Sequence, residues 1–125
     1  NGATTAGSAN GVGTSASLNS PYSLTLSSDD SFAYIADSGN NLIRQLIIST
    51  LAVTTLAGGN GATTAGSANG VGTSASLNSP YSLTLSSDDS FAYIADSGNN
   101  LIRQLIISTL AVTTLAGGNG ATTAG

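Results

Sequence analysis

The feature that most constrains this chain is a perfect internal repeat. Residues 1–59 reappear without a single change as residues 60–118, and residues 119–125 repeat the first seven residues once more. In such a chain the repeated unit is the object that folds, and neighbouring units cover each other's apolar surfaces. We therefore predict repeat 1 at 1–59, repeat 2 at 60–118 and the start of a third repeat at 119–125, and we expect the array to be longer than this sequence.

The residue types that are missing exclude most catalytic chemistry. The charged residues are two Arg and six Asp, and the sequence contains no Lys, Glu, His, Cys, Met or Trp. Thiolate nucleophiles, disulfides, thiolate or imidazole metal sites and His-based proton relays all lack their essential atoms. We therefore predict that the chain is not an enzyme and that it has no catalytic residue, metal site or cofactor.

Charge and hydropathy also limit the partners. A net charge of -4 gives no electrostatic attraction to nucleic acid. No apolar run approaches the roughly 20 residues that a membrane-spanning helix needs. We expect neither a nucleic-acid partner nor a membrane span. Scarce charge and abundant Ser and Thr favour an extracellular or cell-surface location, and they leave O-linked glycans open as a modification.

Each unit divides into a polar loop and a segment of strands. Residues 1–20 are small, polar and interrupted by Gly, which predicts a loop, and residues 21–59 carry the strand signals. The same division places the second loop at 60–79 and the second set of strands at 80–118. The segment 41–49 also fits a helical stripe, but its short apolar stretch and β-branched end favour a strand. The four predicted strands of each unit correspond to 22–27, 32–36, 41–49 and 52–57 of repeat 1.

A family resemblance lies in the middle of these strands. The stretch from Tyr34 to Arg44 has an apolar pair, Ala-Asp, a Gly/Asn turn, an apolar pair and Arg, and it recurs from Tyr93 to Arg103. This pattern resembles the hallmark of an NHL-type β-propeller blade, and the Gly-rich loop upstream resembles the connector before such blades. One departure is Asn10, at a connector position that is often acidic. The resemblance implies an all-β fold of four-stranded antiparallel meander blades, repeated in tandem as a closed ring or an open array.

We interpret the hallmark as structural. Asp37 can accept hydrogen bonds from the amides of its own turn, Gly39 can take a positive φ, and Asn40 or Asn41 tolerates the left-handed region. Arg44 can pair with Asp37 across the hairpin or with a neighbouring unit. The predicted turn and assembly residues are Asp37, Gly39, Asn40, Asn41, Arg44, Asp96, Gly98, Asn99, Asn100 and Arg103.

Other acidic residues receive a similar interpretation. Asp29 and Asp30 form a pair of carboxylates, but a calcium site needs six or more oxygen ligands. We therefore predict that both residues cap a turn.

The need to cover each sheet leads to a prediction of function. A lone meander of short strands is marginal in water, and the unit has no helix to cover its faces. Neighbouring units have to do so, in a ring of about six blades or in an open fibre. We predict a structural repeat protein whose blades pack on one another, by self-assembly, into an extracellular fibril or a longer repeat assembly, without catalysis. The alternative is a propeller module, closed by oligomerisation, that binds a protein, peptide or carbohydrate.

Overall fold

Each repeat folds into one antiparallel sheet. The computed structural model describes residues 4–120. In repeat 1 the strands are β1 (Gly11–Val12), β2 (Pro21–Leu26), β3 (Phe32–Asp37), β4 (Leu42–Ile47) and β5 (Ala52–Gly58). In repeat 2 they are β6 (Gly70–Val71), β7 (Pro80–Leu85), β8 (Phe91–Asp96), β9 (Leu101–Ile106) and β10 (Ala111–Gly117).

Short 3-10 turns connect or follow these strands. They are η1 (Gly13–Ser15), η2 (Ser38–Asn40), η3 (Gly59–Gly61), η4 (Gly72–Ser74), η5 (Ser97–Asn99) and η6 (Gly118–Gly120). Between residues 4 and 120 no helix is long and apolar enough to cross a membrane.

The predicted all-β meander is confirmed, with one strand added. The strand order is β1-β5-β4-β3-β2 in the first sheet and β6-β10-β9-β8-β7 in the second. The predicted four-stranded meander is β2 to β5. The loop prediction for 1–20 is wrong at Gly11 and Val12, because these residues pair with Val53 and Ala52 as the outer edge strand β1. The connector therefore folds back onto its own blade.

Turns separate the strands of each blade, but β4 ends at Ile47, two residues before the predicted end of the strand at 41–49, because residues 48–50 form a turn. The turn from β2 to β3 closes with a hydrogen bond from the Asp30 amide to the Ser27 carbonyl, and Asp30 has a φ of 62°. The turn from β4 to β5 closes from the Leu51 amide to the Ile47 carbonyl, and Leu51 has a φ of 63°. Asp tolerates this left-handed region better than a branched apolar residue does. The same values recur in repeat 2 within a few degrees, so each unit dictates its own turns.

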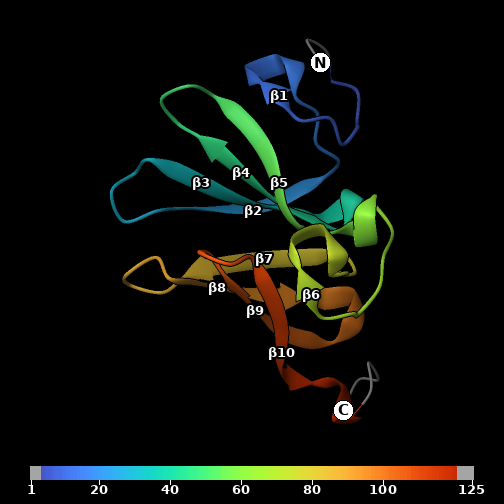
Figure 1. Ribbon diagram of the computed structural model, residues 1–125. Coiled ribbons are helices and arrows are strands. Elements are labelled where there is room, and N and C mark those ends of the chain that lie inside the picture. Colours follow the sequence, from blue (N-terminus) through green and yellow to red (C-terminus); the bar gives the residue numbers. More distant parts are fainter. Residues whose placement is uncertain (1–3, 121–125) are drawn as a thin grey trace.

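The two sheets stack face to face, with β2 beside β7 (Figure 1). Neighbouring side chains of a strand point to opposite faces of its sheet. In repeat 1, Tyr34 and Ala36 of β3 point toward repeat 2, whereas in repeat 2, Ala92 and Ile94 of β8 point back toward repeat 1. The opposite faces of one repeated strand thus meet at the junction.

A single apolar cluster fills the junction between the repeats. Strand β3 contributes an aromatic ring. Aliphatic side chains come from both sheets and from the second connector, which is the segment 60–79 between the two blades. Its buried members are Tyr34, Ala36, Ile43 and Ala57 of repeat 1, and Ala75, Leu77, Leu83, Ala92, Ile94, Leu105 and Val112 of repeat 2.

Candidate functional site

A buried ion pair lies at the centre of each blade. Asp37 is the last residue of β3, and Arg44 lies on β4 opposite Ile35. Arg44 Nη1 is 2.8 Å from Asp37 Oδ2, and both side chains are completely buried. Of the two pairings considered for Arg44, the structure has the one across its own hairpin. Repeat 2 has the same pair between Arg103 and Asp96, again at 2.8 Å with complete burial.

The arginine holds the connector onto the blade. Arg44 Nη1 donates to the Ser17 carbonyl at 3.0 Å, and Nη2 donates to the Ala9 carbonyl and to Asn10 Oδ1, both at 3.1 Å. These are charge-assisted hydrogen bonds, which are roughly twice as strong as neutral ones. A buried guanidinium with four such acceptors, Asp37 included, ties a polar segment with little apolar surface to the sheet.

The neighbouring turn residues complete this anchor. Asp37 Oδ1 accepts the Asn19 amide at 2.8 Å, and Asn40 Nδ2 donates to Asp37 Oδ2 at 2.8 Å and to the Gly7 carbonyl at 2.6 Å. We call Asp37, Asn40 and Arg44, with their repeat-2 counterparts Asp96, Asn99 and Arg103, the connector anchor. Repeat 2 repeats each of these contacts within 0.1 Å.

Two expectations about this turn are wrong. Asp37 accepts hydrogen bonds from the connector and from side chains, and its carboxylate does not cap its own turn. Gly39 does not have a positive φ. A Cβ at Gly39 would lie 2.6 Å from the side chain and 2.7 Å from the carbonyl oxygen of Asn19, so Gly is needed there for close packing of the connector. Gly98 lies against Asn78 in the same way.

Asn41 is the residue of the pair that takes the left-handed conformation, with a φ of 60°. Asn100 has the same φ. The side chain of Asn41 then reaches the second repeat. Its Nδ2 donates to the Thr63 carbonyl at 2.9 Å, and its Oδ1 accepts the Ser79 amide at 2.8 Å. Ser38 Oγ donates to the Pro80 carbonyl beside it. The end of η2 therefore contacts the neighbouring blade.

Asn10 is a residue whose role the sequence analysis missed. Its Oδ1 accepts from Arg44 Nη2 and from Thr55 Oγ1, each at 3.1 Å. The amide oxygen therefore joins the connector, β4 and β5. Its partners are 34 and 45 residues away in the sequence, so no local pattern could reveal the contact.

The acidic turn residues have two different roles. Asp29 Oδ1 accepts the Ser31 amide at 3.0 Å and Ser27 Oγ at 2.9 Å, and these bonds lower the pKa of Asp29. Asp89, the counterpart of Asp30, instead accepts the amide and the hydroxyl of Ser28 in the other repeat, at 3.0 and 2.7 Å from Oδ2. One acid therefore caps its own turn, while the next joins two blades. In the described part of the chain no three acidic, His or Cys side chains gather as a metal site.

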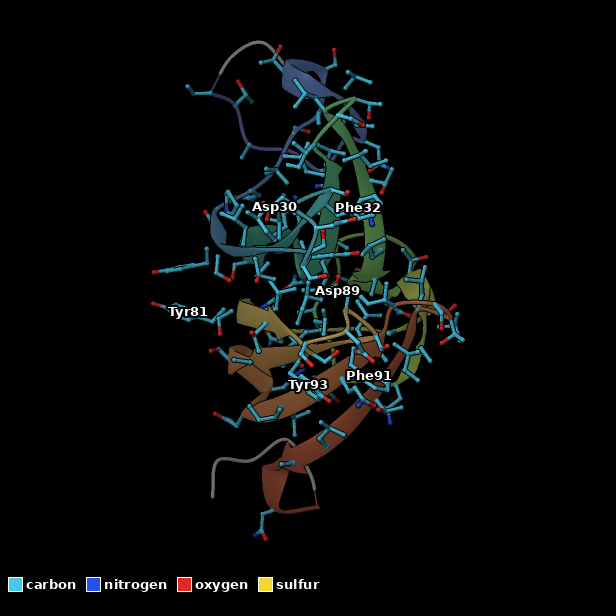
Figure 2. All side chains as sticks on the ribbon, turned by 90° about the vertical axis from the view of Figure 1, so that its left-hand side faces the viewer. Asp30, Phe32, Tyr81, Asp89, Phe91 and Tyr93 are labelled. Carbon is cyan, nitrogen blue, oxygen red and sulfur yellow. The ribbon has the colours of Figure 1, made fainter. Side chains whose placement is uncertain are left out.

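Two tyrosines stack at the inner strands. The rings of Tyr22 on β2 and Tyr81 on β7 have centroids 4.2 Å apart, and both side chains are exposed. Figure 2 shows Tyr81 projecting away from the sheets. A hydrogen bond with Tyr22 and the proximity of that phenol raise the pKa of Tyr81.

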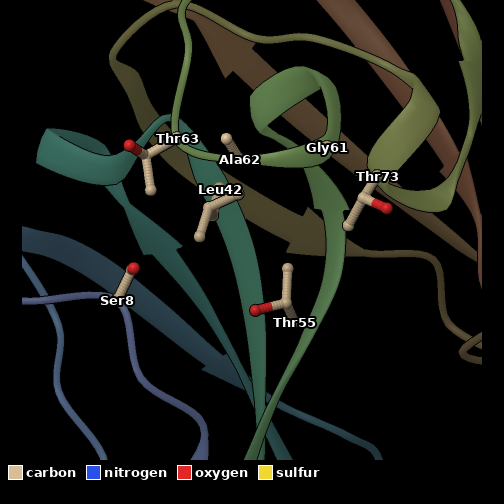
Figure 3. A pocket seen from close by; sticks show the side chains of 7 residues that line it. All are labelled: Ser8, Leu42, Thr55, Gly61, Ala62, Thr63 and Thr73. Carbon is tan, nitrogen blue, oxygen red and sulfur yellow. The ribbon is translucent and has the colours of Figure 1, made fainter.

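A hollow of about 350 Å³ lies where the second connector crosses repeat 1 (Figure 3). We call it the junction pocket. Its wall combines β4, β5 and the first connector with residues of the second connector and η4. The lining residues are Ser8, Leu42, Thr55, Gly61, Ala62, Thr63 and Thr73. The lining thus offers four hydroxyl groups, small alkyl groups and no charge.

Comparisons with known sequences point to the same fold. The LVIVD repeat matches residues 25–43 and 84–102, the equivalent parts of the two units. NHL repeat-containing protein 2 of Bos taurus is 34% identical over 107 residues, which are 85% of this chain and 14% of that protein.

Solved structures resemble the two blades together. An auxiliary nutrient binding protein from Bacteroides ovatus has a TM-score of 0.66 and 22% identity over 79% of this chain and 26% of its own. Its namesake from Bacteroides thetaiotaomicron has a TM-score of 0.66 and 23% identity over 80% of this chain and 26% of its own. A third structure from that species, whose name refers to a phosphatase, has a TM-score of 0.64 and 20% identity over 81% of this chain and 25% of its own.

The chain thus spans between 14% and 26% of the length of these proteins. At such identities the solved structures show the fold alone. The same family is indicated by the hallmark from Tyr34 to Arg44, by the stacked sheets and by the sequence matches. The chain belongs to the NHL-type repeat family, whose repeats form blades of β-propellers.

Proposed function

We propose that this chain is part of a non-catalytic binding module of the β-propeller type, with a ligand site at the junction between consecutive blades. The junction pocket carries the proposal, because its wall is complete only where two repeats meet. The names of two similar structures, both nutrient binding proteins, support a binding role over the fibril that the sequence analysis placed first.

The lining of the junction pocket indicates the class of ligand. Ser8, Thr55, Thr63 and Thr73 can each donate and accept a hydrogen bond, and Leu42 and Ala62 supply apolar contact. A charged ligand would find no counter-charge among these residues. A neutral carbohydrate has the matching combination of hydroxyl groups and C–H surface, and about 350 Å³ is at the small end of ligand sites.

The same lining argues against catalysis. None of the lining side chains titrates near neutral pH, so none can act there as a general acid or base. The buried carboxylate of Asp37 and the guanidinium of Arg44 are occupied by structural hydrogen bonds. A hydroxyl without a neighbouring base is a weak nucleophile. We therefore propose binding without chemical turnover.

The test uses one position that occurs in both repeats. Thr73 lines the junction pocket, whereas Thr14, its counterpart in η1, lies outside it and is exposed. A panel of neutral mono- and disaccharides would be titrated calorimetrically into the wild-type chain and into the Thr73→Arg and Thr14→Arg variants. We expect at least one sugar to bind, Thr73→Arg to weaken that binding tenfold or more, and Thr14→Arg to leave it unchanged. Equal effects of both variants, or no binding across the panel, would contradict the proposal.

A further inference from the structure

The two repeats expose opposite faces of the same blade. Leu24 of β2 is 63% exposed, whereas its counterpart Leu83 is 7% exposed at the junction. In the other direction, Ile102 of β9 is 43% exposed, whereas its counterpart Ile43 is completely buried. The chain thus has two open apolar surfaces, and each consists of residues that are buried at the internal junction.

We define these surfaces by their residues. The repeat-1 outer face consists of Leu18, Pro21, Leu24 and Leu26, whose counterparts Leu77, Pro80, Leu83 and Leu85 belong to or pack on the junction. The repeat-2 outer face consists of Tyr93, Ile102, Leu115 and Ala116, whose counterparts Tyr34, Ile43, Leu56 and Ala57 belong to or pack on the same cluster.

The repeat-1 outer face has a hollow at the position where, in repeat 2, side chains of the neighbouring blade pack. It has a volume of about 230 Å³ and is lined by Leu18, Pro21, Tyr22, Ser23, Leu24 and Ile35. Its counterparts in repeat 2 include Leu77, Leu83 and Ile94, which are buried in the junction cluster. Side chains of repeat 1, among them Ile43 and Ala57, belong to that cluster. The counterparts of Ile43 and Ala57 are Ile102 and Ala116, which lie on the repeat-2 outer face. The repeat-2 outer face therefore carries the side chains that would fill this hollow.

We infer that the repeat-2 outer face of one copy of this chain docks on the repeat-1 outer face of a second copy. The internal junction is the observed form of this contact, because the two outer faces contain the same residues as its two sides. The inference does not depend on the proposed ligand pocket.

Polar groups at the edges of the outer faces match as well. Inside the chain, Ser28 donates its amide and hydroxyl to Asp89. The counterparts are Ser87 and Asp30, and both are exposed. In the docked pair Ser87 of one copy donates to Asp30 of the second copy. Figure 2 labels Asp30 and Asp89 at the ends of the two successive turns.

The carboxylate of Asp30 favours head-to-tail docking over a symmetric contact. Two repeat-1 outer faces that met symmetrically would bring their Asp30 carboxylates to one interface without a cation. A head-to-tail contact instead gives each Asp30 a serine donor. Such heterologous contacts form rings if the rotation closes and filaments if it does not.

The test blocks each outer face separately and then combines the variants. Leu24→Asp places a charge on the repeat-1 outer face, and Ile102→Asp places one on the repeat-2 outer face. Both residues are exposed, so each chain should keep its strand content by circular dichroism. Val12→Asp is the control, because Val12 and its counterpart Val71 are both 60% exposed and thus lie outside the junction in both repeats.

The expected result is a specific pattern of masses in analytical ultracentrifugation. The wild-type chain and Val12→Asp should form species larger than one chain, and each blocked variant alone should sediment as a monomer. An equimolar mixture of Leu24→Asp and Ile102→Asp should form a complex of one copy each, because each variant retains the face that the other needs.

Three outcomes would overturn the inference. They are a wild-type chain that stays monomeric at every concentration, a blocked variant that still assembles alone, and a mixture that remains monomeric. A symmetric contact through the repeat-1 outer faces would give the second of these, since Ile102→Asp retains that face and would still pair with itself.

Discussion

The two repeats have the same sequence but not the same surroundings. Their hairpins, turns and connector anchors agree closely, and Arg44 and Arg103 are both completely buried. Their sheet faces differ, because repeat 1 lacks a neighbour on one side and repeat 2 lacks one on the other. The unit therefore determines the internal structure of a blade, whereas a neighbouring blade determines how much apolar surface is buried.

This difference separates two sources of stability. The connector anchor works within one unit, so it should count equally in both repeats. The junction cluster works between units, so equivalent residues should contribute unequally. Substitutions at paired positions can measure each source, since the local sequence is the same at both.

The largest effect should come from the connector anchor. Arg44→Met and Arg103→Met each leave a buried carboxylate without its cation, and breaking such a pair costs about 3–5 kcal/mol. We expect the two variants to lower the free energy of unfolding by similar amounts in urea titrations followed by circular dichroism. The double variant Asp37→Leu with Arg44→Met should recover part of the loss, because no unpaired charge remains. A large difference between Arg44→Met and Arg103→Met would show that the anchor also depends on the neighbouring blade.

The next largest effect should be a loss of stability that differs between the two repeats at one equivalent position. Ile43→Ala opens a cavity in the junction cluster and should cost about 2–5 kcal/mol. Ile102→Ala changes the same residue on an open face and should cost less than about 1 kcal/mol. Both values should be measured at protein concentrations that keep the chain monomeric, because docking would bury Ile102. Equal costs under these conditions would mean that the junction contributes little to the stability of repeat 1.

The strands could be predicted from the sequence because their signals are local. Alternation along residues 22–27, turn residues such as Asp30 and the short apolar run at 32–36 all act within a few positions. The edge strand β1 has two residues, too few to show any period. Its assignment depends on pairing with Val53, which lies 42 positions away from Gly11.

The contacts of the predicted turn residues could be predicted only in part. Asp37 and Arg44 lie on the two strands of one hairpin, so the sequence predicts their ion pair as one of two possible pairings of Arg44. The other partners of Arg44 lie 27 to 35 residues away in a connector with no regular pattern. The sequence also could not tell which face of β3 meets the next blade, because Tyr34 and Ile35 are both apolar.

A smaller unequal effect should appear at the polar edge of the junction. Asp89→Asn weakens the acceptor for Ser28, and we expect a loss of about 0.5–1.5 kcal/mol, the range of a single hydrogen bond. Asp30→Asn in the monomer should have almost no effect, because the serine donor belongs to the preceding blade and no blade packs on that side of repeat 1. Both positions have a φ of 62°, which Asn tolerates, so backbone strain should not contribute. Matching losses at the two positions would indicate a local turn effect in place of a contact between blades.

The smallest effect concerns pH and should again be equal in both repeats. The amides of Ser31 and Ser90, followed by the hydroxyls of Ser27 and Ser86, hold the pKa values of Asp29 and Asp88 below the ordinary range. A carboxyl group with a lowered pKa in the folded state stabilises the fold above its unfolded pKa of about 3.9. That contribution is lost as the pH falls through the lower folded pKa.

Asp29→Asn and Asp88→Asn should therefore lower the midpoint of urea unfolding slightly at about pH 6, and the difference from wild type should disappear as the pH falls through the lowered folded pKa of these carboxyl groups. Because both acids are exposed and bond only to their own turns, the two variants should give overlapping curves. A curve that differs between them would mean that the neighbouring blade changes the charge of this turn. The division between local and junction contributions would then fail at the position where it should be clearest.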